Sequence, residues 1–194
     1  MIDLEKQKEH FKNHIATFID CDTIKILDFK NPNTSHYRIR FMFEEDYCRL
    51  HISGDLGELI ATNYNNMTWD GFSDFVHNTG YFEGKINTHS RPLYSYDYEL
   101  AKKELEERLE NYDFTPEYDF ETEDELREEK IEDILEDFSY EDGISQRGYE
   151  VLNEIDADCW EYVEHIGRER TGILELYMLA FELAKEQLQS KKQV

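Results

Sequence analysis

The acidic residues of this 194-residue chain are concentrated in one segment that has to fold despite its charge. Residues 96–165 contain 27 Asp and Glu residues against 6 Lys and Arg residues, a net charge of −21, whereas the whole chain carries −24. Residues 1–95 contribute −4 and residues 166–194 contribute +1. Because apolar residues recur at helical spacing within the acidic segment, we expect helices with an acidic outer face and not a disordered tail.

The composition of the chain favours a folded protein of the cytoplasm. Hydrophobic residues make up 39% of the chain and aromatic residues 14%, which is enough for an apolar core. No apolar run approaches the roughly 18 residues that a membrane span needs, and the N-terminus lacks the features of a signal peptide. Cys21, Cys48 and Cys159 are too widely spaced for a zinc motif or a disulfide framework, which favours a reducing compartment. We expect no membrane binding, because anionic lipids repel an acidic chain.

The first half of the sequence predicts a helix followed by an antiparallel sheet. Apolar residues at near-helical spacing predict a helix over residues 2–19. Alternating apolar and polar side chains, or short β-branched runs, then predict strands at residues 23–27, 37–43, 48–52 and 59–62. Residues 63–95 are rich in aromatic residues and predict a short helix near Phe72 within an irregular connection.

The second half predicts helices. Their expected positions are residues 97–112, a segment after Thr122 that Gly143 ends, residues 151–163 and residues 173–188. Thr122 and Glu125 have the spacing of a capping box, and the last helix is apolar enough to be the central packing element. We therefore predict an α+β protein. It has an antiparallel sheet of three or four strands packed by helices, and an acidic C-terminal helical subdomain. Residues 1–95 and 96–194 are expected to form these two parts, packed as one globular unit.

The sequence contains only short patterns typical of enzymes and metal sites. The strands and loops in which such patterns normally occur are not predicted around them. Glu83-Gly84-Lys85 and Glu128-Glu129-Lys130 match the Glu-x-Lys tripeptide of magnesium-dependent nucleases, but neither follows a predicted strand. The acidic runs at 119–125 and 156–159 lack the glycine of a calcium loop. His10 and His14 alone are a weak pair of metal ligands. We expect no cofactor, no bound metal and no enzymatic activity, with a metal-dependent enzyme as the third alternative.

The turn Ser53-Gly54-Asp55-Leu56-Gly57 has two possible interpretations. Two glycines around an aspartate predict a turn between strands that needs positive φ angles. The alternative interpretation places Asp55 beside Arg49, His51 or His77 as a small polar site.

Together with two later runs, this turn carries a resemblance to a family. The runs are Cys48–Glu58, Trp69–Phe75 and Gly80–Ile86. They resemble a recurrent core of bacteriophage accessory proteins, in which a strand ends in a Gly-Asp-x-Gly turn. An aromatic helix and a Gly-Tyr-aromatic…Lys motif follow in those proteins. The resemblance covers about residues 36–110 and implies a phage or prophage origin, which fits an acidic anti-defence protein of the anti-CRISPR kind.

The charge of the acidic segment predicts a binding surface. Its 27 acidic residues cannot be paired with 6 basic ones, and like charges four residues apart destabilise a helix. Duplex DNA has one charge per about 1.7 Å, a density that the segment reaches only when two or three helices pack side by side. The residues expected to replace phosphates are Glu121, Glu125, Glu128, Glu129, Glu132, Asp133, Glu136 and Asp137.

These observations predict a phage-encoded inhibitor in the host cytoplasm. It is expected to block a basic, nucleic-acid-binding defence protein, such as a CRISPR effector nuclease, by mimicking nucleic acid without binding nucleic acid itself. A second hypothesis is a non-catalytic structural or regulatory phage module. In that case the sheet and the aromatic segment form the interface, and the acidic residues are only a solvated surface.

Overall fold

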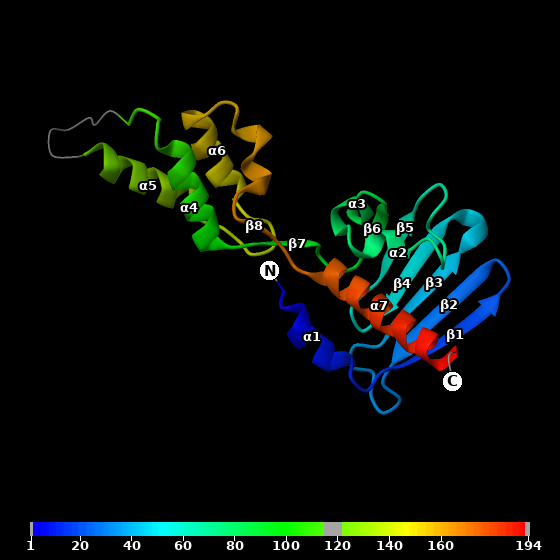
Figure 1. Cartoon of the computed structure of the whole chain (residues 1–194). Coiled ribbons are helices and arrows are strands. Elements are labelled where there is room, and N and C mark those ends of the chain that lie inside the picture. Colours follow the sequence, from blue (N-terminus) through cyan, green and yellow to red (C-terminus); the bar gives the residue numbers. More distant parts are fainter. Residues whose placement is uncertain (1, 115–121, 193–194) are drawn as a thin grey trace. The chain divides into compact units, whose positions relative to one another are not determined.

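The computed structural model describes residues 2–114 and 122–192 and shows an α+β fold, as predicted (Figure 1). The chain forms two compact units, Met1–Leu93 with Gly172–Val194, and Tyr94–Thr171. The second unit is therefore inserted into the sequence of the first. The sequence assigned the last helix to the acidic part, but its apolar residues belong to the core of the first unit.

The first unit contains a six-stranded antiparallel sheet in which each strand pairs with its neighbours in the sequence. Its strands are β1 (Ile15–Cys21), β2 (Ile24–Lys30), β3 (Ile39–Glu44), β4 (Arg49–Gly54), β5 (Leu59–Thr62) and β6 (Ile86–His89). The antiparallel arrangement is confirmed. The predicted number of three or four strands is wrong, because the sequence patterns of the edge strands β1 and β6 do not predict strands.

The edge strand β1 lies in a segment for which the sequence predicts a helix. Helix α1 spans only Leu4–Phe11, and the Asp3 carboxylate caps its first turn. Residues 15–21 instead pair with β2 along the whole strand. β-branched residues such as Thr17 and Ile19 favour strands, and the hairpin supplies backbone hydrogen bonds that outweigh the near-helical spacing.

The other edge strand, β6, is short and mostly polar. Leu59 of β5 lies opposite His89, and Ile60 lies opposite Thr88. The register then shifts between Ile60 and Ala61. The strand is four residues long and only Ile86 is apolar, so the sequence contains no alternation that marks it as a strand.

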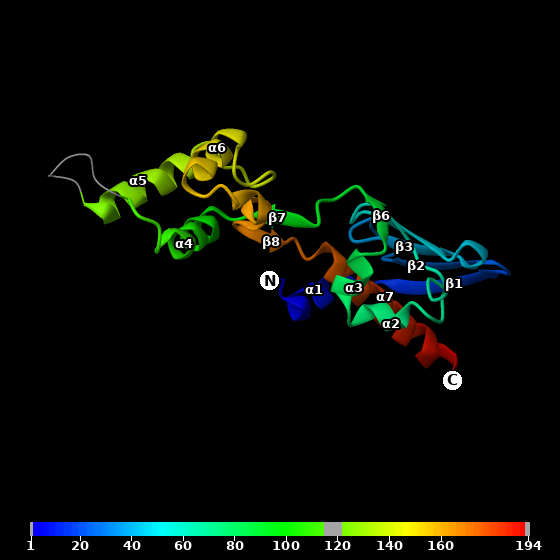
Figure 2. The same cartoon turned by 90° about the horizontal axis from the view of Figure 1, so that it is seen from above.

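Helices cover one face of this sheet. Besides α1 they are α2 (Ser73–Val76), α3 (Thr79–Glu83) and α7 (Ile173–Lys192). Figure 2 shows them on the same side of the sheet. The ring of Phe181 in α7 lies 4.8 Å from that of Phe72 and 5.5 Å from those of Phe41 and Trp69, centre to centre. The last helix is thus the central packing element of the first unit, and aromatic contacts join it to the sheet.

The second unit has its own core. It is built from α4 (Tyr98–Leu109), α5 (Glu123–Leu135) and α6 (Gln146–Ile155), with a two-stranded antiparallel sheet of β7 (Tyr94–Tyr96) and β8 (Arg168–Arg170). Its buried residues are Ala101, Leu105, Leu109, Ile131, Ile134, Leu135, Leu152, Cys159 and Ile166. The helix predicted over residues 151–163 ends at Ile155. Two 3-10 turns, Cys159–Glu161 and Val163–His165, follow it.

Candidate functional site

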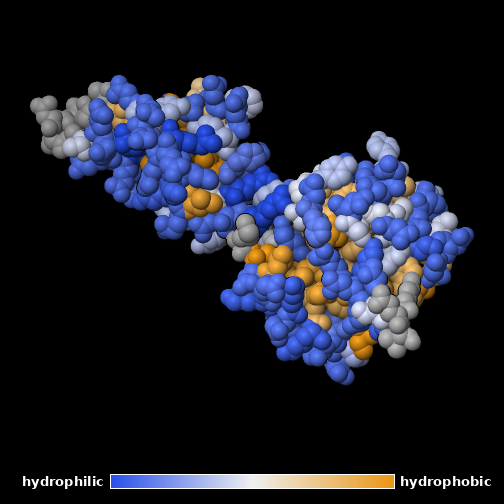
Figure 3. Space-filling model, viewed as in Figure 1, coloured by the Kyte–Doolittle hydropathy of each residue, from blue (hydrophilic) through white to orange (hydrophobic). Residues whose placement is uncertain are grey.

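The second unit carries most of the negative charge of the chain. Residues 94–171 contain 28 Asp and Glu residues against 8 Lys and Arg residues, a net charge of −20, and all other residues together carry −4. Hydrophilic side chains cover most of the visible face of this unit in Figure 3. A surface of this charge attracts basic partners and repels nucleic acid.

The N-terminus of helix α5 has the predicted capping box. The Thr122 hydroxyl accepts a hydrogen bond from the Glu125 N–H group at 3.2 Å, and the Glu125 carboxylate accepts one from the Thr122 N–H group at 3.0 Å. Ile131, Ile134 and Leu135 are buried in the core of the unit. Of the acidic residues between them, Glu132 is exposed and Asp133 is half-buried.

The helices of the second unit pack side by side. Gly148 of α6 lies so close to α5 that a Cβ atom there would be 2.0 Å from the Ile134 carbonyl oxygen. On the α4 side, Lys102 Nζ lies 3.8 Å from Glu128 Oε1. Helix α5 therefore contacts both α4 and α6.

The residues predicted to replace phosphates lie on α5 or directly after it, except Glu121, which lies outside the described residues. Six of them are exposed and Asp133 is half-buried; the exposed ones are Glu125, Glu128, Glu129, Glu132, Glu136 and Asp137. Three form ion pairs: Glu128 with Lys102, Asp133 with Lys130 at 3.7 Å and Glu136 with Arg147 at 2.7 Å. Within residues 2–114 and 122–192, the side chains of Glu129, Glu132 and Asp137 have no ion pair.

Repulsion between like charges lowers the stability of helix α5. Glu128 and Glu132 lie four residues apart within the helix, and a like-charge pair at this spacing costs about 0.2–0.5 kcal/mol. The last turn contains no basic residue to interact with the negative end of the helix dipole. Folding does not require this pattern.

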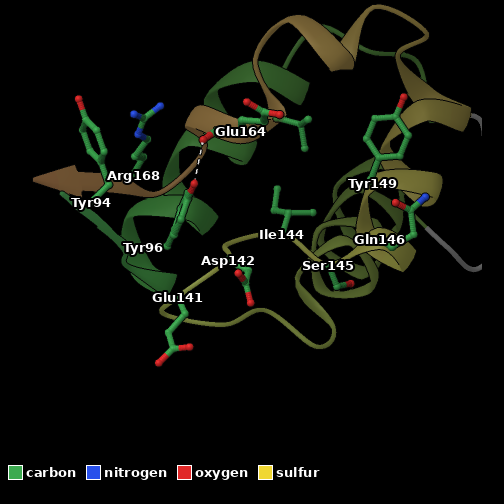
Figure 4. Close-up of a pocket in the computed structure, with 11 residues that line it drawn as sticks. Tyr94, Tyr96, Glu141, Asp142, Ile144, Ser145, Gln146, Tyr149, Glu164 and Arg168 are labelled. Carbon is green, nitrogen blue, oxygen red and sulfur yellow. Dashed lines mark hydrogen bonds between the residues drawn. The ribbon is translucent and has the colours of Figure 1, made fainter. Parts of the chain in front are cut away.

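A pocket in the same unit adds a second acidic feature, which no sequence pattern predicts (Figure 4). Its volume is about 560 Å³. It is lined by Tyr94, Tyr96, Glu141, Asp142, Ile144, Ser145, Gln146, Tyr149, Val163, Glu164 and Arg168. The lining thus contains three acidic residues and one basic residue. The tyrosines come from β7 and α6, about 50 residues apart, so no local pattern in the sequence connects them.

Contacts within the pocket wall fix its shape. The guanidinium of Arg168 lies 3.5 Å from the centre of the Tyr94 ring, and its Nη1 atom lies 2.8 Å from His165 Nδ1. The Tyr96 hydroxyl donates a hydrogen bond to the Glu164 carbonyl oxygen at 3.3 Å. Aromatic faces and carboxylates both attract cations, so this pocket suits a lysine or arginine side chain.

The other candidate residues do not assemble into the sites weighed from the sequence. His10 Nδ1 lies 3.4 Å from His36 Nε2, whereas the buried His14 has its Nε2 atom 3.2 Å from the Tyr37 carbonyl oxygen. Burial lowers the pKa of His14. In the described part of the chain, no group of three or more His, Cys, Asp and Glu side chains is arranged to hold a metal ion.

The turn after β4 has the predicted conformation. Gly54 and Gly57 have φ angles of +146° and +104°. Asp55 accepts a hydrogen bond from the Tyr37 N–H group at 2.9 Å. His51 contacts Glu44 at 3.1 Å, so Asp55 and His51 have different partners. The turn is therefore a structural element of the sheet.

Comparisons with known proteins find no family model, curated protein or solved structure that matches this chain. Among residues 2–114 and 122–192, no helix combines the length and the apolar character needed to cross a membrane. The charge and geometry of the second unit are therefore the basis for assigning a function.

Proposed function

We propose that the chain is an acidic inhibitor whose second unit occupies the nucleic-acid groove of a basic host protein. The proposed setting is phage infection, the target a defence protein such as a CRISPR effector nuclease, and the compartment the host cytoplasm. The supporting observation is the net charge of −20 on residues 94–171, carried in part by helices that share one core. The same charge repels nucleic acid, so the proposal includes no nucleic-acid binding and no enzymatic activity.

The charge spacing of α5 supports this proposal. The helix contains seven acidic and two basic residues among its 13, a net charge of −5. It is roughly 20 Å long, so one net charge falls about every 4 Å. A single nucleic-acid strand carries one charge per about 3.4 Å. Lysine and arginine side chains placed to bind the phosphates of one strand would therefore meet carboxylates at similar intervals.

The aromatic and acidic pocket gives this surface a means of selecting its partner. Charge alone attracts many basic proteins, and it acts mainly on association rates. A lysine or arginine side chain inserted between Tyr96 and Tyr149 would gain cation–π contacts and a nearby carboxylate. Such an anchor distinguishes one basic protein from another.

Charge reversal tests the proposal. A variant with Glu128→Lys, Glu129→Lys and Glu132→Lys is compared with a matched variant of the first unit, Glu5→Lys, Glu9→Lys and Asp74→Lys. A basic partner is first captured from a bacterial lysate and eluted with a salt gradient. Its DNA binding is then measured by gel shift with each form of the chain. We expect the wild-type chain and the matched variant to displace DNA and the α5 variant to fail, with displacement weakening as salt increases. Equal displacement by all three forms would exclude nucleic-acid mimicry by α5.

A second candidate is a non-catalytic interaction module that binds through the sheet. It is favoured by apolar side chains on the face opposite the helices, where Ile15 and Ile19 remain 45% and 48% exposed. Partner binding that survives charge reversal on α5 but is lost with Ile19→Asp would support this candidate. Stoichiometric binding of Mg²⁺, Mn²⁺, Ca²⁺ or Zn²⁺ in a calorimetric titration would instead favour a metal-dependent enzyme.

A further inference from the structure

A small cationic pocket lies on the face of the sheet opposite the helices. It has a volume of about 150 Å³ and is lined by Asp28, Lys30, Arg38, Arg40 and Ser53. Three basic side chains meet one carboxylate there, so the lining carries a net charge of +2 in a chain of net charge −24. The pocket lining is therefore positively charged, whereas the remaining residues together are negatively charged.

The pairing of the strands builds the pocket. Asp28 of β2 lies opposite Arg40 of β3, which lies opposite Ser53 of β4, so the three form one row across the sheet. Gly54, at the end of β4, allows this strand to lie close to the start of β3. A Cβ atom at position 54 would lie only 2.1 Å from the Arg38 carbonyl oxygen. Arg38 is thereby placed beside the row.

A buried carboxylate holds one of the cations in a fixed position. Asp28 is only 7% exposed, although it lies on the uncovered face. Its carboxylate accepts hydrogen bonds from Arg40 Nε at 3.0 Å and Nη2 at 2.9 Å, and a longer one from Lys30 Nζ at 3.4 Å. This two-point contact fixes the plane of the guanidinium and leaves its Nη1 atom for another ligand.

Arg38 supplies a second cation that is not neutralised. In the described part of the chain, its side chain has no ion pair. Asp55, whose N–H group donates to the Arg38 carbonyl oxygen at 2.8 Å, directs its carboxylate to the Tyr37 N–H group. The pocket therefore combines a fixed guanidinium, a free guanidinium, an ammonium group and the Ser53 hydroxyl.

We propose that this pocket binds the terminal phosphate group of a small phosphomonoester or inorganic phosphate. The net charge of +2 matches a phosphate dianion, and the planar donors of arginine suit phosphate oxygens. A volume of about 150 Å³ holds one such group, well below the volume typical of sites for larger ligands. Nucleic acid is a poor fit, since each of its phosphodiesters carries one charge and the rest of the chain repels a polyanion.

The test is a titration of the full chain with inorganic phosphate at about pH 7.5, followed by calorimetry and by amide chemical shifts. We expect one binding site, with shifts at Ser53 and at its neighbours in β3. Dimethyl phosphate, a monoanionic diester, is expected to bind at least tenfold more weakly. Glycerol phosphate separates a phosphomonoester ligand from free phosphate, because contacts to the glycerol would make it bind more tightly than inorganic phosphate.

Two variants with the same charge change test whether phosphate binds in this pocket. Arg38→Gln removes the free guanidinium from an exposed position without disturbing the Asp28 contact, and we expect it to weaken phosphate binding about tenfold. Arg49→Gln makes the same charge change on the same face near the other end of β4 and is expected to leave binding unchanged. The proposal is overturned by an absence of saturable binding up to about 10 mM phosphate, by equal binding of dimethyl phosphate, or by equal losses in the two variants.

Discussion

The side chain of Gln187 in α7 accepts a hydrogen bond from the backbone N–H group of Ala16 in β1 at 2.6 Å. The same amide donates to the His14 carbonyl oxygen at 3.0 Å, and Lys191 Nζ lies 3.4 Å from the Ala16 carbonyl oxygen. The last helix thus satisfies backbone groups of an edge strand more than 170 residues earlier in the chain. Edge strands with free backbone groups are prone to pair with other chains, so this contact also protects the sheet.

Gln187→Ala should destabilise the first unit. The substitution leaves the Ala16 N–H group and the His14 carbonyl group without their partner, which costs about 1–3 kcal/mol. The free energy of unfolding in urea provides the measurement. Gln189→Ala, at an exposed position of the same helix, is the control and should change this free energy by less than about 0.5 kcal/mol. Equal effects of the two substitutions would contradict the role given to Gln187.

Gly148→Ala should destabilise the second unit. The added Cβ atom would collide with the backbone of α5, and overpacking of this kind costs about 1–3 kcal/mol. Thermal unfolding followed by far-UV circular dichroism should show a lower midpoint for the helical signal. Gly84→Ala is the matched control, since its Cβ atom would lie 3.6 Å from the nearest atom. A similar midpoint for both variants would argue against tight packing of α5 on α6.

Arg40→Gln should lower stability in a pH-dependent way. The Arg40 guanidinium holds the pKa of Asp28 below its usual range. A depressed carboxyl pKa stabilises the fold above the unfolded value of about 3.9, and this contribution is lost as the pH falls through the folded-state value. The difference in unfolding free energy between wild type and Arg40→Gln should therefore be constant from about pH 7 to 5 and shrink towards about pH 3. Urea titrations at these pH values measure it, and a difference that does not depend on pH would refute the assignment.

Glu132→Lys should stabilise the second unit while weakening inhibition. The change removes the like-charge contact with Glu128 within the helix and replaces it with an attractive one, which is worth about 0.4–1 kcal/mol in total. Urea unfolding measures the gain, and displacement of DNA from the captured partner measures the loss. Glu5→Lys on α1 tests whether any added positive charge has the same effect on displacement. Stabilisation without loss of displacement would mean that Glu132 is only a solvated residue.

Local patterns in the sequence predicted those elements whose signals are themselves local. The capping box of Thr122 and Glu125 depends on residues three positions apart, so the start of α5 was predicted correctly. The predicted end at Gly143 is wrong, because the helix ends at Leu135 and Glu136 is already extended. The alternation in β3 and β4 likewise reflects one buried face of the sheet. The antiparallel arrangement and the α+β class follow from these segments.

Features that depend on distant segments were not predicted. β1 has helical spacing but becomes a strand because β2 provides a partner, and β6 has almost no apolar residues of its own. Each of the two pockets is assembled from separate elements: β7, α6 and β8 in one case, and β2, β3 and β4 in the other. Among the residues expected to replace phosphates, the sequence did not show that Asp133 is half-buried or that Glu136 pairs with Arg147.

The β7–β8 ladder brings the two ends of the second unit together. Tyr94 lies opposite Arg170, so the chain enters and leaves the second unit at neighbouring positions. Among residues 2–114 and 122–192, none of those that build the core of the first unit lies between 94 and 171. A recombination event can therefore exchange the whole inserted module, or remove it, while the scaffold keeps every side chain of its own core.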